Sequence, residues 1–465
     1  MSTRRTFGAG KLSAMAGLFL LGMPALAAAQ DAPAEINGAD TAWMLMSAAL
    51  VLLMTPALAF FYGGLVRSKN ALNTMMMSVV SLGFVGVLWA LIGYSLAFAE
   101  GSAWIGGTSY FFLRGVTLEP QGTIPHLLFM AFQGTFAIIT AALISGAIVE
   151  RMRFSAYVTF ICLWMLLVYS PIAHWVWGGG WLMQWGALDF AGGTVVHVNA
   201  AVAALVAALV VGKRKDYATT QLLPHNVPFT LLGAGLLWFG WFGFNAGSAL
   251  GANGIASLAF VTTMLAPAAT LVVWTFLDGM RSGKPTAVGC ATAIVVGLVA
   301  ITPGAGLVSP LSAIIIGAVA AVPSYFGLVW RAKTSLDDSL DVVAAHGLGG
   351  TVGALLTGVF ADESLNGVGN GLLFGNPMQL AIQGAAVLAA IVYSGLASFI
   401  ILKLISLVMP LRATSDDETT GLDLSLHGEE AYLHADGSGR ASLSVSEAAG
   451  RRTVEGLSAA LGDRA

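Results

Sequence analysis

Charged residues are scarce in this sequence: Asp, Glu, Lys and Arg make up only 10% of its 465 residues, against about 25% in an average soluble domain. Hydrophobic residues make up 57%, and the mean hydropathy is +0.81. A soluble fold of this composition would have too few polar side chains to cover its surface, so we expect lipid to surround most of the chain. The net charge of −3 also argues against a surface that binds nucleic acid.

Cysteines and catalytic motifs are also few or missing. The two cysteines, Cys162 and Cys290, each lie within an apolar run, which provides neither a disulfide framework nor a metal site. The sequence shows no nucleophile–base pair, phosphate-binding loop or cluster of metal ligands. We therefore expect no metal, no other cofactor and no enzymatic activity.

The N-terminus has the features of a secretory signal peptide. Arg4, Arg5 and Lys11 precede a short apolar stretch at 18–26, and two Ala-x-Ala cleavage motifs lie between residues 25 and 29. The apolar stretch is too short to span a bilayer. We expect residues 1–29 to be removed, which leaves the mature N-terminus outside the cytoplasm; the alternative is an uncleaved first helix.

Long apolar runs are what the sequence has in abundance. A membrane-spanning helix needs about 20 apolar residues. Backbone polar groups find no partner in lipid, so each run is predicted to be a helix, and the fold class is an all-α polytopic membrane protein. The eleven candidate spans are 42–65, 73–99, 125–149, 154–174, 190–211, 227–246, 256–278, 287–304, 311–330, 343–361 and 378–408.

Positive charges alternate between the loops. Loops that follow odd-numbered spans hold eleven Lys or Arg residues, whereas the other five loops hold only Arg114. Because Lys and Arg are retained in the cytoplasm, this bias predicts a multi-pass protein of the cell inner membrane with a periplasmic N-terminus and a cytoplasmic C-terminus. The eleven charges are Arg67, Lys69, Arg151, Arg153, Lys213, Arg214, Lys215, Arg281, Lys284, Arg331 and Lys333.

Polar residues return at about residue 409. The expected organisation is a signal peptide at 1–29, a membrane domain at 30–408 and a cytoplasmic tail at 409–465. Within the tail, the stretch 421–429 mixes apolar and polar residues and could dock on the membrane domain. Residues beyond about 434 have the composition of a disordered chain.

Two histidines lie at membrane depth, where ionisable groups are costly and each one is a functional hypothesis. His197 is in the fifth candidate span and His346 in the tenth. Two groups of five spans have opposite orientations, so this spacing predicts an inverted five-plus-five repeat that brings the histidines together, followed by an extra C-terminal helix. Neutral imidazoles would form a hydrogen-bonding rail in an apolar pore. The alternative is two unrelated buried histidines, each bonded to a neighbour.

Aromatic residues gather at the predicted outer ends of three spans. Phe136 lies in the third span, the segment 174–181 contains three tryptophans, and the segment 241–248 contains Phe244 and Ser248. Aromatic faces attract a desolvated cation by up to about 2 kcal/mol, and a hydroxyl can accept a hydrogen bond from an N–H group. The alternative is that these rings belong to the aromatic belt found at every membrane interface.

Asp189 begins the fifth span on the same side. Its simplest role is that of an N-cap that accepts hydrogen bonds from backbone N–H groups. The carboxylate would also add negative potential near a cation site.

These stretches together resemble the Amt/Rh ammonium transporter family, in its bacterial Amt branch. The resemblance covers about residues 40 to 433, and it implies the eleven-helix inverted-repeat fold and a homotrimer with one pore per subunit. Bacterial members also bind a PII-type signalling protein at the cytoplasmic face through a tail motif, which this chain keeps and extends by about thirty residues. The matching stretches are 187–197, 241–248, 146–154, 421–423 and 427–429.

The resemblance also implies roles for individual residues. An outer recruitment site for ammonium corresponds to Phe136, Trp177 and Ser248, with Asp189 behind it. A two-phenylalanine gate corresponds to Phe136 and Phe244, and the twin pore histidines are His197 and His346.

Selection against potassium suggests the mechanism. Potassium and ammonium have nearly the same size and charge, but only ammonium can lose a proton and enter an apolar pore as a neutral molecule. We therefore expect ammonium to be recruited outside, conducted as ammonia and reprotonated inside, with or without a relayed proton. The alternatives are an ammonium sensor coupled to a cytoplasmic partner and a channel for another small neutral solute such as carbon dioxide.

Overall fold

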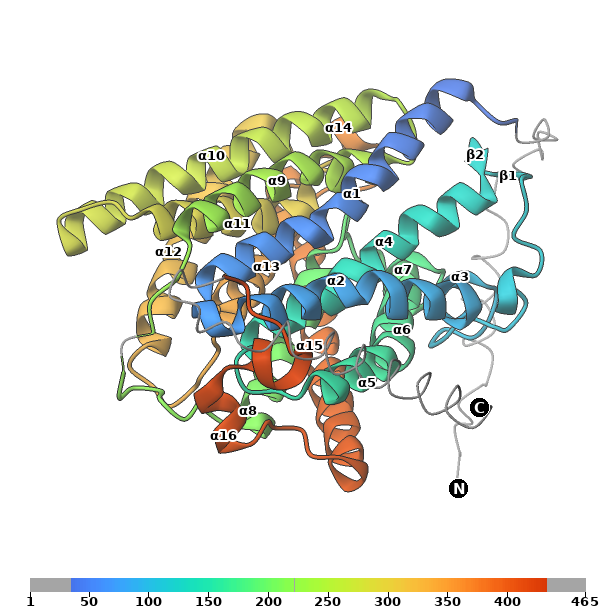
Figure 1. Ribbon diagram of the computed structural model, residues 1–465. Coiled ribbons are helices and arrows are strands. Elements are labelled where there is room, and N and C mark those ends of the chain that lie inside the picture. Colours follow the sequence, from blue (N-terminus) through green and yellow to red (C-terminus); the bar gives the residue numbers. More distant parts are fainter. Residues whose placement is uncertain (1–34, 221, 433–465) are drawn as a thin grey trace, which may run out of the picture.

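The computed structural model describes residues 35–220 and 222–432, and nearly all regular structure in them is helical (Figure 1). In this part of the chain the one sheet is a hairpin in which β1 (Pro120–Gln121) pairs antiparallel with β2 (Ile124–Pro125). The α-helices are α1 (Gly38–Leu65), α2 (Ala71–Leu88), α3 (Tyr94–Phe98), α4 (His126–Ile144), α5 (Phe154–Trp164), α6 (Ser170–Trp177), α7 (Trp181–Gln184), α8 (Asn199–Val211), α9 (Val227–Ala246), α10 (Gly254–Ser282), α11 (Ala287–Ile301), α12 (Pro310–Arg331), α13 (Gly349–Phe360), α14 (Glu363–Asn366), α15 (Pro377–Val408) and α16 (Ser415–Thr420).

Eleven helical segments in the described ranges are long and apolar enough to cross a membrane, which confirms the predicted number. Polar caps mark where several of them begin: the side chains of Asn37, Asn253 and Thr286 accept hydrogen bonds from N–H groups in the first turn that follows. The spans are Gly38–Leu65, Ser68–Phe98, His126–Ala147, Phe154–Gln184, Gly193–Val211, Val227–Ala249, Gly254–Ser282, Ala287–Gly304, Pro310–Arg331, Val343–Phe360 and Pro377–Val408.

Two spans differ in extent from the prediction. The sequence predicts the fourth span at 154–174 and an outer loop after it, but helical structure continues to Gln184. The tryptophan-rich segment therefore belongs to the span itself, as α6 and α7. The apolar run alone predicts too early an end for the fourth span. Tryptophans are common at the membrane interface, and a helix can continue through them. The second span begins at Ser68, with a 3₁₀ turn ahead of α2, rather than at 73.

Matching helices of the two five-span groups meet in the bundle. The first span, α1, packs along the sixth, α9. The fifth span, formed by the π-helical turn Gly193–Val198 and α8, packs against the tenth, formed by the π-helical turn Val343–Leu348 and α13. The eleventh span, α15, lies over α5, α8 and α13. The fold is thus the inverted five-plus-five repeat with an extra C-terminal helix that was expected from the spacing of the histidines.

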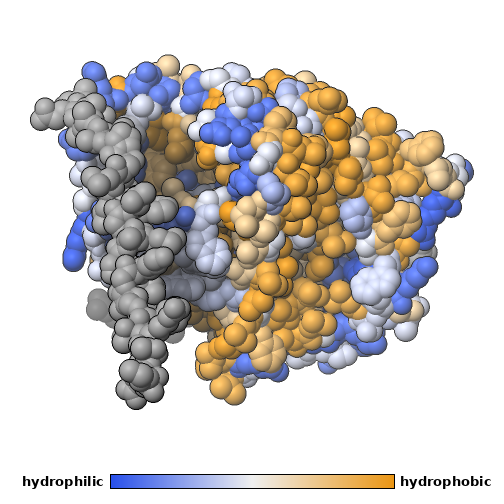
Figure 2. Space-filling view, turned by 180° about the vertical axis from the view of Figure 1, so that it is seen from behind, coloured by the Kyte–Doolittle hydropathy of each residue, from blue (hydrophilic) through white to orange (hydrophobic). Residues whose placement is uncertain are grey.

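The outside of the bundle is apolar. Figure 2 shows a broad hydrophobic surface over the helices, with hydrophilic residues gathered toward its ends. Val272 and Phe276 of α10 and Leu407 of α15 are among the exposed large hydrophobic side chains. Lipid is the solvent that such a surface requires, and the chain is a multi-pass membrane protein.

The tail docks on the membrane domain, as the mixed composition of 421–429 predicts. The carboxylate of Asp423 accepts hydrogen bonds from the backbone N–H groups of Leu72 and Asn73, at 3.0 and 2.7 Å, where α2 begins. An acid at a helix N-terminus is favoured by the helix dipole. The predicted signal peptide at 1–29 and the predicted disordered stretch beyond about 434 lie outside the described residues.

Candidate functional site

His197 and His346 meet inside the bundle. Their Nδ1 atoms are 3.2 Å apart, and their ring centroids are 5.2 Å apart. Both residues are buried. A hydrogen bond between two imidazole nitrogens needs one N–H donor and one bare acceptor, so the pair holds at least one neutral ring. The alternative of two unrelated histidines bonded to separate neighbours does not fit this contact.

The backbone before His197 is held by Asp189. Its carboxylate accepts hydrogen bonds from four consecutive N–H groups, those of residues 192 to 195, at 2.6 to 3.1 Å. Gly192 has the left-handed φ of 112° that this sharp start of the helix requires. The expected N-cap role is therefore confirmed. Both carboxylate oxygens are used in this way, so Asp189 fixes the backbone that leads to His197.

Asp338 repeats this arrangement in the other half, and sequence reasoning missed it. Its carboxylate accepts hydrogen bonds from the N–H groups of Val342 and Val343, at 3.1 and 2.7 Å, at the start of the span that carries His346. Asp338 precedes His346 by eight residues, and Asp189 precedes His197 by eight residues as well. This equal spacing was a signal in the sequence that could have identified Asp338.

Aromatic rings continue the path from the histidines toward one end of the bundle. Phe136 of α4 and Phe244 of α9 stack with centroids 4.1 Å apart and an interplanar angle of 24°. Phe244 lies 6.1 Å from His197, and Trp241, one turn earlier on α9, lies 5.4 Å from it. The indole of Trp241 was not predicted to belong to the site, although its spacing from Phe244 places both on one helix face.

Between Phe244 and the two histidines lies a cavity of only about 10 Å³, lined otherwise by apolar side chains such as Leu143 and Leu237. That volume is about the least that admits one water-sized molecule. Within the described residues, Nε2 of His197 is buried and has no hydrogen-bond partner. The cavity thus offers one small molecule an imidazole nitrogen and otherwise apolar walls.

Phe136, Trp177, Phe244 and Ser248 come together beyond this cavity, and we call them the aromatic entrance. The rings of Phe136 and Trp177 are perpendicular, with centroids 6.0 Å apart. Nε1 of Trp177 donates a hydrogen bond to the carbonyl oxygen of Asp189 at 2.8 Å. The hydroxyl of Ser248 donates to the carbonyl oxygen of Phe244 at 2.8 Å, so its lone pairs are available to an N–H donor.

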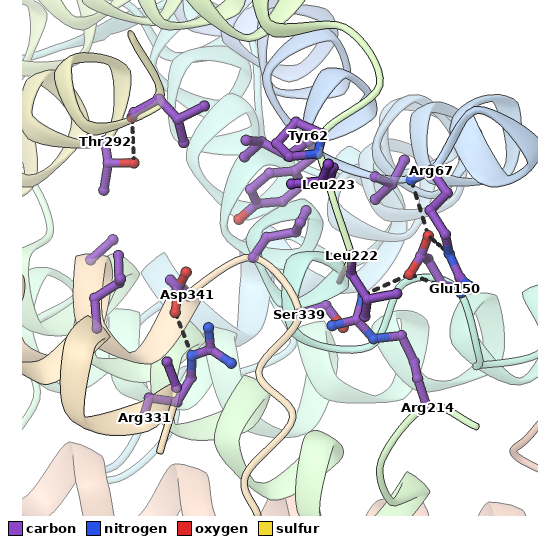
Figure 3. Close-up of a pocket in the computed structure, with 18 of the residues that line it drawn as sticks. Tyr62, Arg67, Glu150, Arg214, Leu222, Leu223, Thr292, Arg331, Ser339 and Asp341 are labelled. Atoms are coloured by element: carbon purple, nitrogen blue, oxygen red, sulfur yellow. Dashed lines mark hydrogen bonds and ion pairs between the residues drawn. The ribbon is translucent and has the colours of Figure 1, made fainter. Parts of the chain in front are cut away.

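A second cavity, of about 510 Å³, lies on the other side of His346, and we call it the charged vestibule (Figure 3). His346 lines both cavities. Arg67, Glu150, Arg214, Arg331 and Asp341 supply the charge of the vestibule. These five charged side chains and this volume suit water, in contrast to the narrow apolar cavity beyond His346.

Buried ion pairs hold the loops around the vestibule together. Glu150 pairs with Arg67 at 3.0 Å and with Arg214 at 2.6 Å, and Arg214 pairs with Asp337 at 2.7 Å. Burial alone would raise the pKa of Glu150, but Arg214 and Arg67 together lower it to about 2. Four of the five loops that the charge bias predicts on one side of the membrane contribute to the vestibule, through Arg67, Glu150, Arg214 and Arg331, and Glu150 is the acid that joins two of the others to its own.

The aromatic entrance, the narrow cavity with the paired imidazoles and the charged vestibule thus follow one another through the bundle. In the described part of the chain no group of three or more His, Cys, Asp or Glu side chains is placed to hold a metal ion.

Comparisons with known proteins identify the relatives of this chain. A model of the Ammonium Transporter Family matches residues 42–432. An ammonium transporter of Bacillus subtilis is 50% identical over 398 residues, which cover 84% of this chain and 98% of that protein. The crystal structure of Candida albicans Mep2 is similar with a TM-score of 0.78 and 36% identity, over 82% of this chain and 88% of that one. A structure described as a Sensor Amt Protein has a TM-score of 0.78 and 30% identity, over 84% and 98% of the two chains.

Proposed function

The chain belongs to the ammonium transporter family, and on that premise we propose that it recruits ammonium at the aromatic entrance and conducts ammonia past His197 and His346. The observation that carries this proposal is the unpartnered Nε2 of His197 in a cavity of about 10 Å³. A buried polar atom without a partner is costly, so a passing molecule that forms a hydrogen bond there is favoured. Ammonia is small enough and can donate or accept that bond.

The apolar centre excludes ions that cannot shed their charge. Moving a bare cation into a medium of low dielectric costs on the order of tens of kcal/mol by the Born estimate. Two imidazoles without fixed negative charge do not offset that cost, and the rest of the narrow cavity is apolar. Potassium is therefore excluded, whereas ammonium can lose a proton before it enters.

The aromatic entrance supplies the recruitment step. A cation in front of Trp177 and Phe136 meets ring faces, and the lone pairs of Ser248 can accept one of its N–H groups. Phe136 and Phe244, stacked at 4.1 Å, close the way to the histidines, so passage needs a ring to rotate. This motion is the gate.

We further propose that the charged vestibule faces the cytoplasm of a bacterial inner membrane and that the subunits form homotrimers. A PII-type signalling protein is the proposed partner of the docked tail. The basic loops around the vestibule support the orientation. A hydrophobic surface as extensive as that in Figure 2 leaves room for both lipid and neighbouring subunits.

The test is a current measurement on proteoliposomes adsorbed to a solid-supported membrane, with protein-free liposomes as the control. A jump in ammonium concentration should give a current if the proton follows the ammonia. If ammonia crosses alone, the same jump should instead raise the internal pH without a current. Potassium at the same concentration should give neither signal.

A chain that binds ammonium but shows neither signal would favour a sensor, which is how one of the similar structures is described. A chain that speeds the entry of carbon dioxide but not of ammonia would favour a gas channel, for which the cation-attracting rings have no use.

A further inference from the structure

Asp341 has a backbone conformation that residues other than glycine seldom adopt. Its φ is 60°, in the left-handed region. Asp341 follows the capping residue Asp338 by three residues, and Gly192, with its φ of 112°, follows Asp189 by the same number. The two halves of the fold therefore need the same sharp turn, and one half uses glycine while the other uses an acid. Strain of this kind is concentrated at functional sites, so the carboxylate of Asp341 needs an explanation.

The location of Asp341 suggests what the carboxylate does. It lines the charged vestibule, which His346 also lines, so ammonia that passes His346 enters the cavity where Asp341 lies. Figure 3 shows its carboxylate directed at Arg331, whose Nε donates to it at 2.5 Å. The Asp341 side chain is 21% exposed, so water can reach it.

The neighbouring charges give Asp341 a different pKa from Glu150, the other acid of this cavity. Arg67 and Arg214 keep Glu150 ionised, with a pKa of about 2, so Glu150 holds no proton to donate at neutral pH. Burial and the nearby Asp338 raise the pKa of Asp341 to about 7, although Arg331 and Arg214 oppose the shift. Asp341 is thus protonated in a substantial fraction of molecules near neutral pH.

We propose that Asp341 returns a proton to ammonia as it leaves the pore past His346. In this step the O–H bond of the carboxylic acid breaks, the lone pair of ammonia forms a new N–H bond, and ammonium is left beside the carboxylate. Ammonium then departs through the vestibule, and the carboxylate takes a new proton from water on that side. Arg331 holds the carboxylate in place. The inference rests on the proposed function, since it needs ammonia to arrive uncharged.

Two substitutions at Asp341 distinguish the role of its carboxylic proton from the effect of its backbone conformation. Asp341→Asn keeps the size of the side chain and tolerates left-handed φ, but it cannot donate a carboxylic proton. Asp341→Gly relieves the backbone strain and also removes the carboxyl group. Asp216→Asn is the matched control, because Asp216 is a 39% exposed carboxylate paired with Arg67 at the same end of the protein.

The measurement is ammonium uptake into right-side-out membrane vesicles loaded with buffers from about pH 6 to about pH 8, with a constant external pH. The acid form of Asp341 disappears as the internal pH rises through about 7. Wild-type uptake, corrected for vesicles without the protein, should therefore fall by up to about tenfold over this range. Asp216→Asn should follow the wild-type curve. Both Asp341 variants should be slow throughout and lose the dependence on internal pH.

Thermal unfolding in detergent checks that the variants fold, and Asp341→Gly should be at least as stable as the wild type because its turn is unstrained. If wild-type vesicles take up ammonium and either folded Asp341 variant keeps the wild-type rate and pH dependence, the role of Asp341 is disproved while the proposed function stands. If wild-type vesicles take up no ammonium, the proposed function fails and this inference fails with it.

Discussion

The helices that carry His197 and His346 have the same local construction in opposite surroundings. In each, an aspartate eight residues before the histidine caps the start of a π-helical turn, and a left-handed residue follows the aspartate by three positions. His197 then faces apolar and aromatic side chains, including Trp241 and Phe244. His346 borders the charged vestibule. The shared aspartate cap satisfies the backbone groups that a broken helix in a membrane leaves without partners. The surroundings differ because, in the proposed path, His197 lies at the apolar centre and His346 lies where the path opens into the vestibule.

The number of backbone groups capped also differs between the two halves. Asp189 satisfies four N–H groups and Asp338 satisfies two. Both caps lie inside the bundle, with Asp189 8% and Asp338 0% exposed, so an N–H group that loses its cap has little access to water in either half. This comparison suggests which changes would be felt most strongly.

The largest expected effect is the loss of a cap. Asp189→Ala orphans four buried N–H groups, and Asp338→Ala orphans two. At about 1 kcal/mol for each group, the changes should lower stability by about 4 and about 2 kcal/mol. Thermal unfolding in detergent measures both. Asn at either position keeps one acceptor oxygen and should lose less. Equal losses for the two alanine variants would show that the number of capped N–H groups does not set the loss of stability.

Much of the fold could be predicted because lipid permits so few solutions. Apolar length gave the number of spans, and the spacing of His197 and His346 gave the inverted repeat. Periodicity could not predict the π-helical turns Gly193–Val198 and Val343–Leu348, because a π turn departs locally from the 3.6-residue period of the α-helix. The extension of the fourth span through Trp181 was missed because its tryptophans resemble an interfacial loop. Glu150 forms ion pairs with Arg214, which is 64 positions away in the sequence, and with Arg67, which is 83 positions away. Local sequence patterns do not predict contacts over such separations.

The next effect concerns what the pore conducts. His197→Asp or His346→Asp places a fixed charge in the apolar centre, where it offsets the dehydration of a passing cation, so each variant should admit potassium. The leak should be larger for His346→Asp, because the vestibule lets water reach that side chain. Leucine at either position should slow ammonium and keep potassium out. Potassium current, or growth of a strain without its own potassium uptake, tests this. If folded aspartate variants still exclude potassium, the barrier to potassium lies at Phe136 and Phe244 and not at the histidines.

A smaller effect is expected at the aromatic entrance, where affinity rather than selectivity should change. Trp177→Leu removes the ring that we propose binds the cation, which is worth about 1–2 kcal/mol, or about five- to thirtyfold in apparent affinity. Trp185→Leu is the matched control, since Trp185 directly follows α7 and is 59% exposed. The concentration dependence of uptake is the measurement. An unchanged dependence for Trp177→Leu would assign this residue to the interfacial belt alone.

The smallest effects are expected in the tail, none of whose described residues lines the vestibule. The N–H of Leu422 donates to Oδ1 of Asn70 at 2.8 Å, and Nδ2 of Asn70 donates to Glu150 at 2.9 Å. The docked tail is thus two hydrogen bonds away from the ion pairs of the vestibule. A chain that ends at residue 433 keeps these contacts and should transport like the full chain, whereas a chain that ends at 420 loses them and should be altered.

A point substitution tests the same link without removing any chain. Gly421 has a φ of 113°, and a Cβ atom there would lie 2.6 Å from the carbonyl oxygen of Lys69, so Gly421→Ala should displace the tail. Gly428→Ala is the matched control, because Gly428 also has a positive φ, of 69°, but faces open space. Gly421→Ala should change the transport rate severalfold at most, since the pore and the vestibule stay intact, and Gly428→Ala should change it less. Wild-type rates for Gly421→Ala and for the chain that ends at 420 would leave the docked tail without influence on transport.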